Sequence, residues 1–478
     1  MIGRTILAAL MLALVIFLAS PEVRAQEEPQ SPSDSQPLPP APPKPAGVAF
    51  PSVEETDNNG LQPDSAPLTG VQNPTLGTPE IRHSYWVPGL QFSSNILSNG
   101  ASNGSGNTGW VANNYFIGNL SLLAAWNNST LAVNYSGGGF VSTDSAQGSG
   151  AYHQLALADT IQTGRWQFVI LDQFSHTPQS SFGYGGGTNL GIPGVGGSLG
   201  GTTPGLGGNY TPNQSVYGVG PYYSNTGSLQ LTYALSPRGS ITLSGAYGIN
   251  SFTQSGNYDT NTTVASVGYN YLLTRSDTIG VIYRFNASQY PGLPQAYGSN
   301  SVSIAYGRKI TGRIALRLFI GPEITQYRVP IGGSSQNDGF SASANVTYSI
   351  RKGSITGNYL HGLSGGSGVL VGSILDSVSG GASHSLGRVW TGGINFGYSR
   401  NSPVGGTTAT SQPVYTDWFA GANVSRPIGR DFNFALAYTA TIGNYGGTGC
   451  TSTNCSNSNT FHAITVNFQW HPRPFVLP

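Results

Sequence analysis

The chain has 478 residues, of which 8% are charged, 11% are aromatic and 68 are glycine. Soluble globular chains carry about 25% charged residues and about 7% glycine, and disordered chains are poor in aromatic residues, so neither class fits. Its 20 basic and 19 acidic side chains give a net charge of +1, which excludes the basic footprint of a nucleic-acid-binding protein. After the first twenty or so residues, no uncharged apolar run approaches the roughly 18 residues of a membrane helix. The class that remains is a β-rich protein whose surface does not need charge to stay dispersed.

Residues 1–25 have the pattern of an export signal. Arg4 supplies the positive charge, Ile6–Leu18 is apolar, and Val23–Ala25 forms a small-residue cleavage site. The apolar run of about 13 residues is too short for a membrane anchor. We therefore expect cleavage after Ala25.

Residues 26–84 are rich in Pro, Ser and Gln and include the run PLPPAPPKP. Such a composition favours extended polyproline II over a packed core. We expect a disordered periplasmic tether. A segment that contacts the cell wall or enters a barrel lumen remains the alternative.

From Tyr85 onward hydrophobic residues recur with a period of two, as in β-strands. One face of each segment is apolar with aromatic residues at its ends, and the other is small, hydroxylic and largely uncharged. This is the pattern of transmembrane strands that face lipid outside and water inside. The clearest segments are 340–350, 432–442, 229–235 and 464–470.

Short turns alternate with long Gly/Ser/Asn/Pro-rich connections between these segments. This is the hairpin rhythm of bacterial outer-membrane barrels, in which the short turns are periplasmic. Eight short turns join sixteen strands, and one further strand at each end, near 86–94 and 461–470, makes about eighteen. The segment 376–386 is mostly Ser and Gly, so sixteen stays possible. The eight turns lie at 127–128, 163–164, 237–239, 275–277, 311–312, 351–353, 387–388 and 429–431.

The predicted fold is all-β, a closed antiparallel transmembrane β-barrel over residues 85–478. In hydrocarbon every strand edge must be paired, so a sheet persists there only when it closes. An even strand count places both termini in the periplasm, on the side of the tether. A soluble β-sandwich is the alternative, but it would carry far more charge on its solvent face.

The signal peptide, the turn and loop rhythm, and the amphipathic last strand HAITVNFQW together resemble a porin-type outer-membrane β-barrel of Gram-negative bacteria. The resemblance is one of architecture and fixes no subfamily. It implies outer-membrane lipids and the barrel-assembly machinery as partners, with Phe468 and Trp470 in the assembly signal. Because HPRPFVLP follows, Phe475 is the alternative terminal aromatic residue. Many porins are trimers, and the oligomeric state stays open here.

The longest connection, Thr177–Tyr222, contains no charged residue and is the third external one. In the porins that this chain resembles, the third loop commonly folds into the lumen and narrows it. Tyrosines there could stack on sugar rings and hydrogen-bond through their hydroxyls. A surface-displayed glycine-rich loop is an equally weighted alternative. The candidate constriction aromatics are Phe182, Tyr184, Tyr210, Tyr217 and Tyr222.

Three charged residues alternate against apolar neighbours in a way that directs them to the lumen: Arg284, Arg317 and Glu323. An arginine facing lipid at mid-membrane costs about 2–4 kcal/mol, so the lumen is the cheaper site. We predict that these residues line the channel and give at most a mild anion preference. Pairing with lumenal partners that only braces the wall is the alternative.

The remaining chemical signals are weak. Cys450 and Cys455 predict a small loop-closing disulfide in an exported chain, and no ligand set for a metal surrounds them. Gly196–Gly200 matches G-x-S-x-G without the strand–turn–helix context of a nucleophile. His361, His384 and His462 lack any supporting motif. We therefore expect neither enzymatic activity nor a cofactor.

Two functions remain. The first is a passive channel for small hydrophilic, mainly neutral solutes, since barrels of about 16–18 strands leave an aqueous bore unless they are filled. The second is a structural or surface-interaction barrel with no open channel. Conductance distinguishes them.

Overall fold

The computed structural model describes a set of segments between residues 68 and 476. All described residues belong to one unit, residues 45–478. Within the described part of the chain no helix is long and apolar enough to cross a membrane. The described residues are 68–69, 71–72, 84–98, 110–143, 149–177, 205–206, 221–253, 257–311, 313–329, 333–365, 371–404, 414–446 and 457–476.

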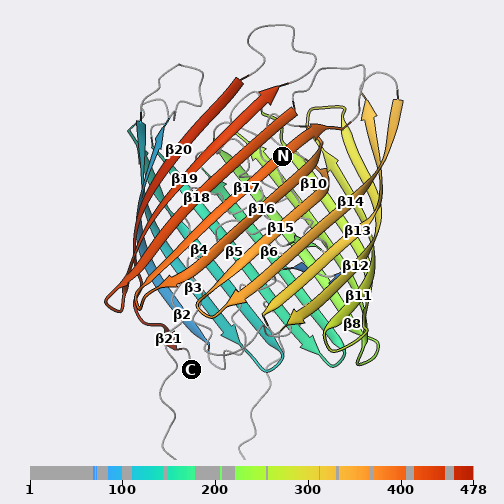
Figure 1. Ribbon diagram of the computed structural model, residues 1–478, viewed down its shortest axis with the longest axis horizontal. Coiled ribbons are helices and arrows are strands. Elements are labelled where there is room, and N and C mark those ends of the chain that lie inside the picture. Colours follow the sequence, from blue (N-terminus) through green and yellow to red (C-terminus); the bar gives the residue numbers. More distant parts are fainter. Residues whose placement is uncertain are drawn as a thin grey trace, which may run out of the picture. The chain divides into compact units, whose positions relative to one another are not determined.

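Eighteen long strands of the described residues form one closed antiparallel barrel (Figure 1). The first nine are β2 (Tyr85–Ser98), β3 (Trp110–Ala125), β4 (Ser129–Ser142), β5 (Ser149–Thr163), β6 (Trp166–Thr177), β8 (Tyr222–Ala234), β9 (Gly239–Phe252), β10 (Thr260–Leu272) and β11 (Asp277–Gln289). The other nine are β12 (Ala296–Thr311), β13 (Ile314–Val329), β14 (Gly333–Ile350), β15 (Gly353–Ser364), β16 (Ser373–Leu386), β17 (Trp390–Pro403), β18 (Val414–Ile428), β19 (Phe432–Gly446) and β20 (Asn457–Trp470).

The barrel closes where its last strand pairs with its first. Leu90 of β2 is the register partner of Trp470 of β20, and Phe92 is the partner of Phe468. Because this pairing leaves no open edge, the backbone groups of every strand are satisfied within the sheet, as a membrane requires. The Ser/Gly-rich segment near 376–386 is strand β16 and pairs on both sides. The predicted count of eighteen is therefore confirmed over sixteen.

Three further short strands lie outside this ring of eighteen. β21 (Phe475–Val476) extends the pairing of β2 beyond the end of β20. β1 (Val71–Gln72) and β7 (Gly205–Leu206) pair antiparallel with each other as a separate two-stranded sheet.

The short turns that the structure describes lie together at one end of the barrel (Figure 1). We call the end with the short turns the turn mouth and the other end the loop mouth. Three of the predicted turns contain a glycine in the left-handed region, Gly164, Gly387 and Gly429, with φ of 57°, 82° and 69°. A side chain with a Cβ is strained there, which explains why glycine marks these turns in the sequence.

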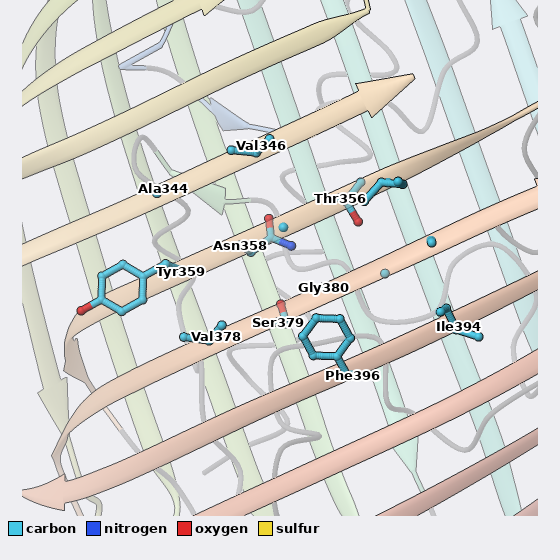
Figure 2. Close-up of a pocket in the computed structure, with 14 residues that line it drawn as sticks. Ala344, Val346, Thr356, Asn358, Tyr359, Val378, Ser379, Gly380, Ile394 and Phe396 are labelled. Carbon is cyan, nitrogen blue, oxygen red and sulfur yellow. The ribbon is translucent and has the colours of Figure 1, made fainter. Parts of the chain in front are cut away.

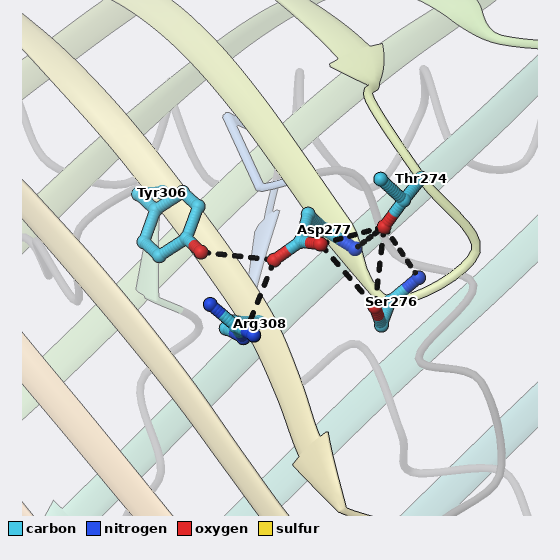
Figure 3. A network of polar contacts seen from close by, with 5 residues as sticks. All are labelled: Thr274, Ser276, Asp277, Tyr306 and Arg308. Atoms are coloured by element: carbon cyan, nitrogen blue, oxygen red, sulfur yellow. Dashed lines mark hydrogen bonds and ion pairs between the residues drawn. The ribbon is translucent and has the colours of Figure 1, made fainter.

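One short turn shows how the turn mouth is held together (Figure 3). Asp277 Oδ2 accepts hydrogen bonds from Thr274 Oγ1 at 2.6 Å and from Ser276 Oγ at 3.2 Å. Its Oδ1 accepts one from Tyr306 Oη at 2.9 Å, and Arg308 Nε lies 3.5 Å away. Arg308 is 53% exposed, so its ion pair contributes little, and the hydroxyl contacts fix the β10–β11 turn.

The two faces of the wall are inverted relative to a soluble protein. Large apolar side chains point outward and are exposed, for example Leu229 at 51%, Val281 at 50% and Ile304 at 56%. Small polar side chains point inward and are buried, for example Ser303 at 3% and Asn467 at 1%. Such an outer surface is stable only against an apolar medium. The chain is therefore a transmembrane β-barrel of the outer-membrane type, as its sequence predicted.

Aromatic residues gather at both ends of the outer face. At the turn mouth Trp166 packs on Tyr233 with ring centroids 4.4 Å apart, and Trp86 stacks on Phe475 at 4.8 Å. Towards the loop mouth Tyr398 packs on Trp418 at 4.4 Å. These are the two aromatic girdles that border the hydrocarbon layer in barrels of this kind.

Candidate functional site

The inner wall is the surface that could carry function, and most of it is built from hydroxyl and amide side chains. Cross-strand pairs bond to each other: Ser244 and Ser266 at 2.6 Å, and Asn345 Nδ2 to Asn358 Oδ1 at 2.6 Å. The period of two places every second residue of each strand here. Because these groups are neutral and paired, the wall can hydrogen-bond water and polar solutes without imposing a strong field.

Arg284 and Glu323 lie on the inner face at the same level of the wall. Both are register partners of Ser301, Arg284 from β11 and Glu323 from β13. Strand spacing then separates their Cα atoms by roughly 10 Å. Arg284 is 3% exposed and Glu323 4%, so neither side chain extends freely into an open bore. Their predicted role in lining an ion path stays a prediction.

Arg317 also lies on the inner face, closer to the turn mouth. Its register partners are Gly307 of β12 and Asn345 of β14. It is less buried than Arg284 and Glu323. Arg317 is thus the predicted inner-wall charge that has most access to a solute.

The sequence interpretation missed a fourth inward charge. Asp417 of β18 is fully buried, at 0% exposure, and its register partners are Ser399 and Gly443. Its neighbour Trp418 is 56% exposed on the outer face. Alternation against this tryptophan is the signal that would have directed Asp417 to the lumen.

The described end of the predicted tether contacts this inner wall near the turn mouth. The backbone N–H of Thr69 donates to Asn270 Oδ1 at 3.0 Å, and Asn270 Nδ2 donates to Thr69 Oγ1 at 2.7 Å. Thr69 is 0% exposed and Leu68 7%. At these residues the chain is bound to the wall instead of forming a free spacer. Elsewhere in 26–84 the tether assignment stays a prediction.

The predicted constriction loop is described only in part. Phe182, Tyr184, Tyr210 and Tyr217 lie outside the described residues. Tyr222 is the first residue of β8, and its ring packs on Phe252 with centroids 5.5 Å apart. Between the ends of the loop, Leu206 and Gly205 pair with Val71 and Gln72. The loop therefore reaches the N-terminal segment that binds the wall.

The described ends of a second connection, that between β15 and β16, lie against the inner wall at the loop mouth, where the sequence interpretation expected nothing. The Tyr290 hydroxyl donates to the carbonyl oxygen of Gly365, directly after β15. A Cβ on Gly365 would lie 2.5 Å from Ser288 Oγ, so this close approach requires glycine. Leu363 and Val371 pack there with Tyr290 and Tyr297 in a buried cluster. The described residues Gly365 and Val371 thus cover part of the inner wall.

The remaining predicted residues lie elsewhere. Cys450 and Cys455 fall outside the described residues. Phe468 and Trp470 lie at the turn-mouth end of β20, with Phe468 exposed on the outer face. Phe475 follows them in β21, so aromatic residues of both β20 and β21 face outward at this mouth.

Two of the histidines considered in the sequence, His361 and His462, lie on the outer face and contact neighbouring wall residues. His361 Nδ1 lies 2.5 Å from Asp376 Oδ1, and its ring stacks on Phe340. The register partners of His361 are Ala342 and Asp376, so no serine lies beside it. His462 hydrogen-bonds to the Tyr438 hydroxyl at 2.8 Å. Among the described residues no group of three or more His, Cys, Asp or Glu could hold a metal ion.

A shallow hollow marks the outer face between β14 and β17 (Figure 2). It has a volume of about 420 Å³ and arises where Gly357 lacks a side chain between Val346 and Ile355, whereas the Phe396 ring lies over Gly380. The lining is almost wholly apolar, which suits contact with acyl chains and offers no catalytic group.

Comparisons with known proteins add only distant structural likeness. No protein-family model and no curated protein matches the sequence. Among solved structures, the outer membrane protein OpdK of Pseudomonas aeruginosa is 9% identical with a TM-score of 0.42, and the match covers 82% of this chain and 99% of that one. OccK2 (OpdF) of the same organism, solved in complex with glucuronate, is 10% identical with a TM-score of 0.41, covering 82% and 98%. Function must therefore be inferred from the barrel itself.

Proposed function

We propose that the protein is an outer-membrane channel for the passive diffusion of small hydrophilic, mainly neutral solutes. The observation that supports it is the closed ring of eighteen strands with a polar, largely uncharged inner wall. At a strand spacing of about 4.8 Å and a tilt of about 40°, eighteen strands enclose a bore about 35 Å across between backbones. Such a width admits water and solutes wherever chain segments leave it free.

The preference for neutral solutes follows from the inner-face charges. Two basic residues within the wall, Arg284 and Arg317, are set against two acidic ones, Glu323 and Asp417, and Lys309 adds a positive charge at the turn-mouth end of β12. Pores select ions through rings of one sign of charge or through a narrow diameter. With the signs this evenly matched, we expect weak discrimination between anions and cations.

Reconstitution tests the proposal directly. The full chain is inserted into liposomes and planar bilayers, and swelling is measured with neutral sugars of graded size and with charged analogues of matched size. We expect stable open-channel steps and swelling rates that fall with solute size more than with charge. Absence of both conductance and swelling from correctly folded protein would contradict the channel function.

A structural barrel without an open channel is the second candidate. Two observations favour it: Thr69 is bound to the inner wall of β10 at the turn mouth, and Gly365 lies against the inner wall of β10 and β11 at the loop mouth. In that case the folded protein would give no conductance in planar bilayers and no liposome swelling with any solute.

The location and partners extend the same proposal. An outer-membrane position in a Gram-negative cell suits the apolar outer face, with both ends of the barrel chain at a periplasmic turn mouth. Tyr85 and Trp470, at the start of β2 and the end of β20, both lie at this mouth. Protease protection of tags at each terminus in intact cells tests this orientation, and the mass of the complex in detergent tests whether three copies assemble.

A further inference from the structure

We propose that residues 68–69 and 71–72 form an internal constriction that is anchored in a groove of the barrel wall near the turn mouth. The groove belongs to β9–β13, and the segment narrows the bore from within. The effect on transport rests on the proposed channel function, whereas the docking itself does not.

The first support is the bonding of Thr69. Its N–H and its Oγ1 bond to the two ends of a single amide, that of Asn270. Its hydroxyl also contacts that of Thr242, whose Oγ1 reaches the Gly268 carbonyl oxygen at 3.4 Å. Two bonds to one amide fix both the position and the direction of the segment. A chain that merely passed the wall would not use its backbone and side chain on the same partner.

The second support is a groove in the wall that fits this segment. A Cβ on Gly268 would lie 2.3 Å from Thr69 Cβ, and one on Gly307 would lie 2.9 Å from Leu68 Cδ2. On the strand between them, a Cβ on Gly280 would lie 3.0 Å from Thr69 Cγ2. Three neighbouring strands, β10, β11 and β12, thus omit a side chain where the segment lies. Any larger residue at Gly268 would displace it.

The third support is the packing of Leu68. It forms a buried cluster with Ala305 of β12 and Phe319 of β13. Leu68 is 7% exposed, Ala305 0% and Phe319 6%. An aromatic residue on the inner face of a water-filled bore would be costly, and Leu68 removes it from water. The leucine therefore gives the groove an apolar end beside the polar Asn270 end.

The fourth support is the path of the chain. In the closed order of described strands, nine steps separate β2 from β12 in either direction, so the two strands lie on opposite walls. Leu68 contacts β12, and the chain re-enters the wall at Tyr85 of β2. The 17 residues from 68 to 85 can span up to about 55–60 Å, more than the width of the bore. The anchor thus holds the chain against the wall farthest from its own first strand.

The fifth support is the strand pairing beyond the anchor. Val71 and Gln72 pair with Leu206 and Gly205 from the long β6–β8 connection. Val71 follows Thr69 by two residues, so this small sheet lies within about 7 Å of the anchored threonine. The loop expected to narrow the bore and the N-terminal segment therefore meet in one element. None of the residues 68–72, 205 and 206 is charged, so it restricts solutes by size.

A disulfide tests the docking without any reference to transport. Thr69→Cys and Thr242→Cys are combined in the full chain with Cys450→Ser and Cys455→Ser. Because the two hydroxyls touch, oxidation of the folded barrel should close a disulfide, read as a shift in mobility and in peptide mass. The control pair joins Thr69→Cys to Gln91→Cys, which lies on the inner face of β2, and should stay reduced. A control pair that oxidises as fast as the test pair would overturn the docking.

A wall variant tests the constriction. Gly268→Ala should expel Thr69 and raise both single-channel conductance and the size limit for neutral sugars. Gly339→Ala is the matched control, because its Cβ would meet no atom nearer than 4.0 Å on the inner face, and it should conduct like the parent. Conductance of Gly268→Ala equal to that of Gly339→Ala would refute the constriction. A disulfide that forms in a barrel without conductance would refute the channel function and leave the docking intact.

Discussion

The outer face gives the sharpest test of the membrane-spanning fold, through one substitution placed at two depths. Ile304 of β12 is 56% exposed on the outer face, and Ile310 on the same face is 50% exposed. Six residues separate them, which is about 20 Å along the strand and about 15 Å along the membrane normal at a tilt of about 40°. An apolar band about 25 Å tall extends about 12 Å from its centre. Ile304 therefore lies near mid-membrane, whereas Ile310 lies beyond the band.

The expected costs differ accordingly. Ile304→Arg should lower the free energy of unfolding by about 2–4 kcal/mol, and Ile310→Arg by about 0–1 kcal/mol. Native Arg308 lies between the two positions, two residues from Ile310, and is 53% exposed, which shows that the wall already accepts a guanidinium on the turn-mouth side of Ile304. The measurement is urea unfolding of each variant in lipid vesicles, followed by tryptophan fluorescence. In a soluble β-protein both exposed positions would tolerate arginine. Equal costs at the two sites would refute the lipid-facing assignment.

Three further predictions concern the lumen and the last strand. Arg317→Glu should shift the reversal potential in a salt gradient in the direction of cation selectivity, whereas Arg308→Glu on the outer face should leave it unchanged. An unchanged reversal potential in Arg317→Glu would show that Arg317 does not line the ion path. Gly365→Ala should displace the start of the β15–β16 connection from Ser288 and raise conductance. Gly357→Ala, whose Cβ would meet nothing within 4 Å, should leave conductance unchanged. Equal conductance of the two variants would show that this connection does not restrict the bore. Phe468→Ala should lower the amount of folded protein recovered from outer membranes more than Phe434→Ala does, because only Phe468 belongs to the last strand. The two rings pack with centroids 5.0 Å apart, so equal losses would show that the effect comes from lost packing and not from the assembly signal.

The wall of the barrel could be predicted because its information is local. Alternation within each strand assigns a side chain to lipid or lumen, and a glycine such as Gly164 or Gly387 marks a turn that needs positive φ. Even the Ser/Gly-rich β16 follows from counting hairpins, although its own pattern is weak. The same rule would have found Asp417 had it been applied to β18. Periodicity therefore contains both the strand count and the facing of each residue.

The contents of the bore could not be predicted in the same way. Thr69 and Asn270 are 201 residues apart, and nothing in the composition near Thr69 distinguishes it from the proline-rich stretch before it. The glycines that receive it look, in sequence, like any small inner-face residue of a barrel strand. Only the register of β10, β11 and β12 shows that Gly268, Gly280 and Gly307 form one groove. Contacts of this kind depend on how distant strands line up, which alternation does not encode.

Because these contacts lie inside the ring of strands, the width of the bore and the size limit for solutes are set by different parts of the chain. Strand number sets the outer limit of the bore, about 35 Å here, but the segments at Thr69 and Gly365 lie inside that limit at opposite mouths. Both segments make neutral hydrogen bonds and apolar contacts with the wall. Solute size would then be controlled by chain segments that a single added methyl group can displace, while the charge balance of the wall stays unchanged. Gly268→Ala and Gly365→Ala should therefore raise the size limit without altering ion selectivity, and Arg317→Glu should do the reverse.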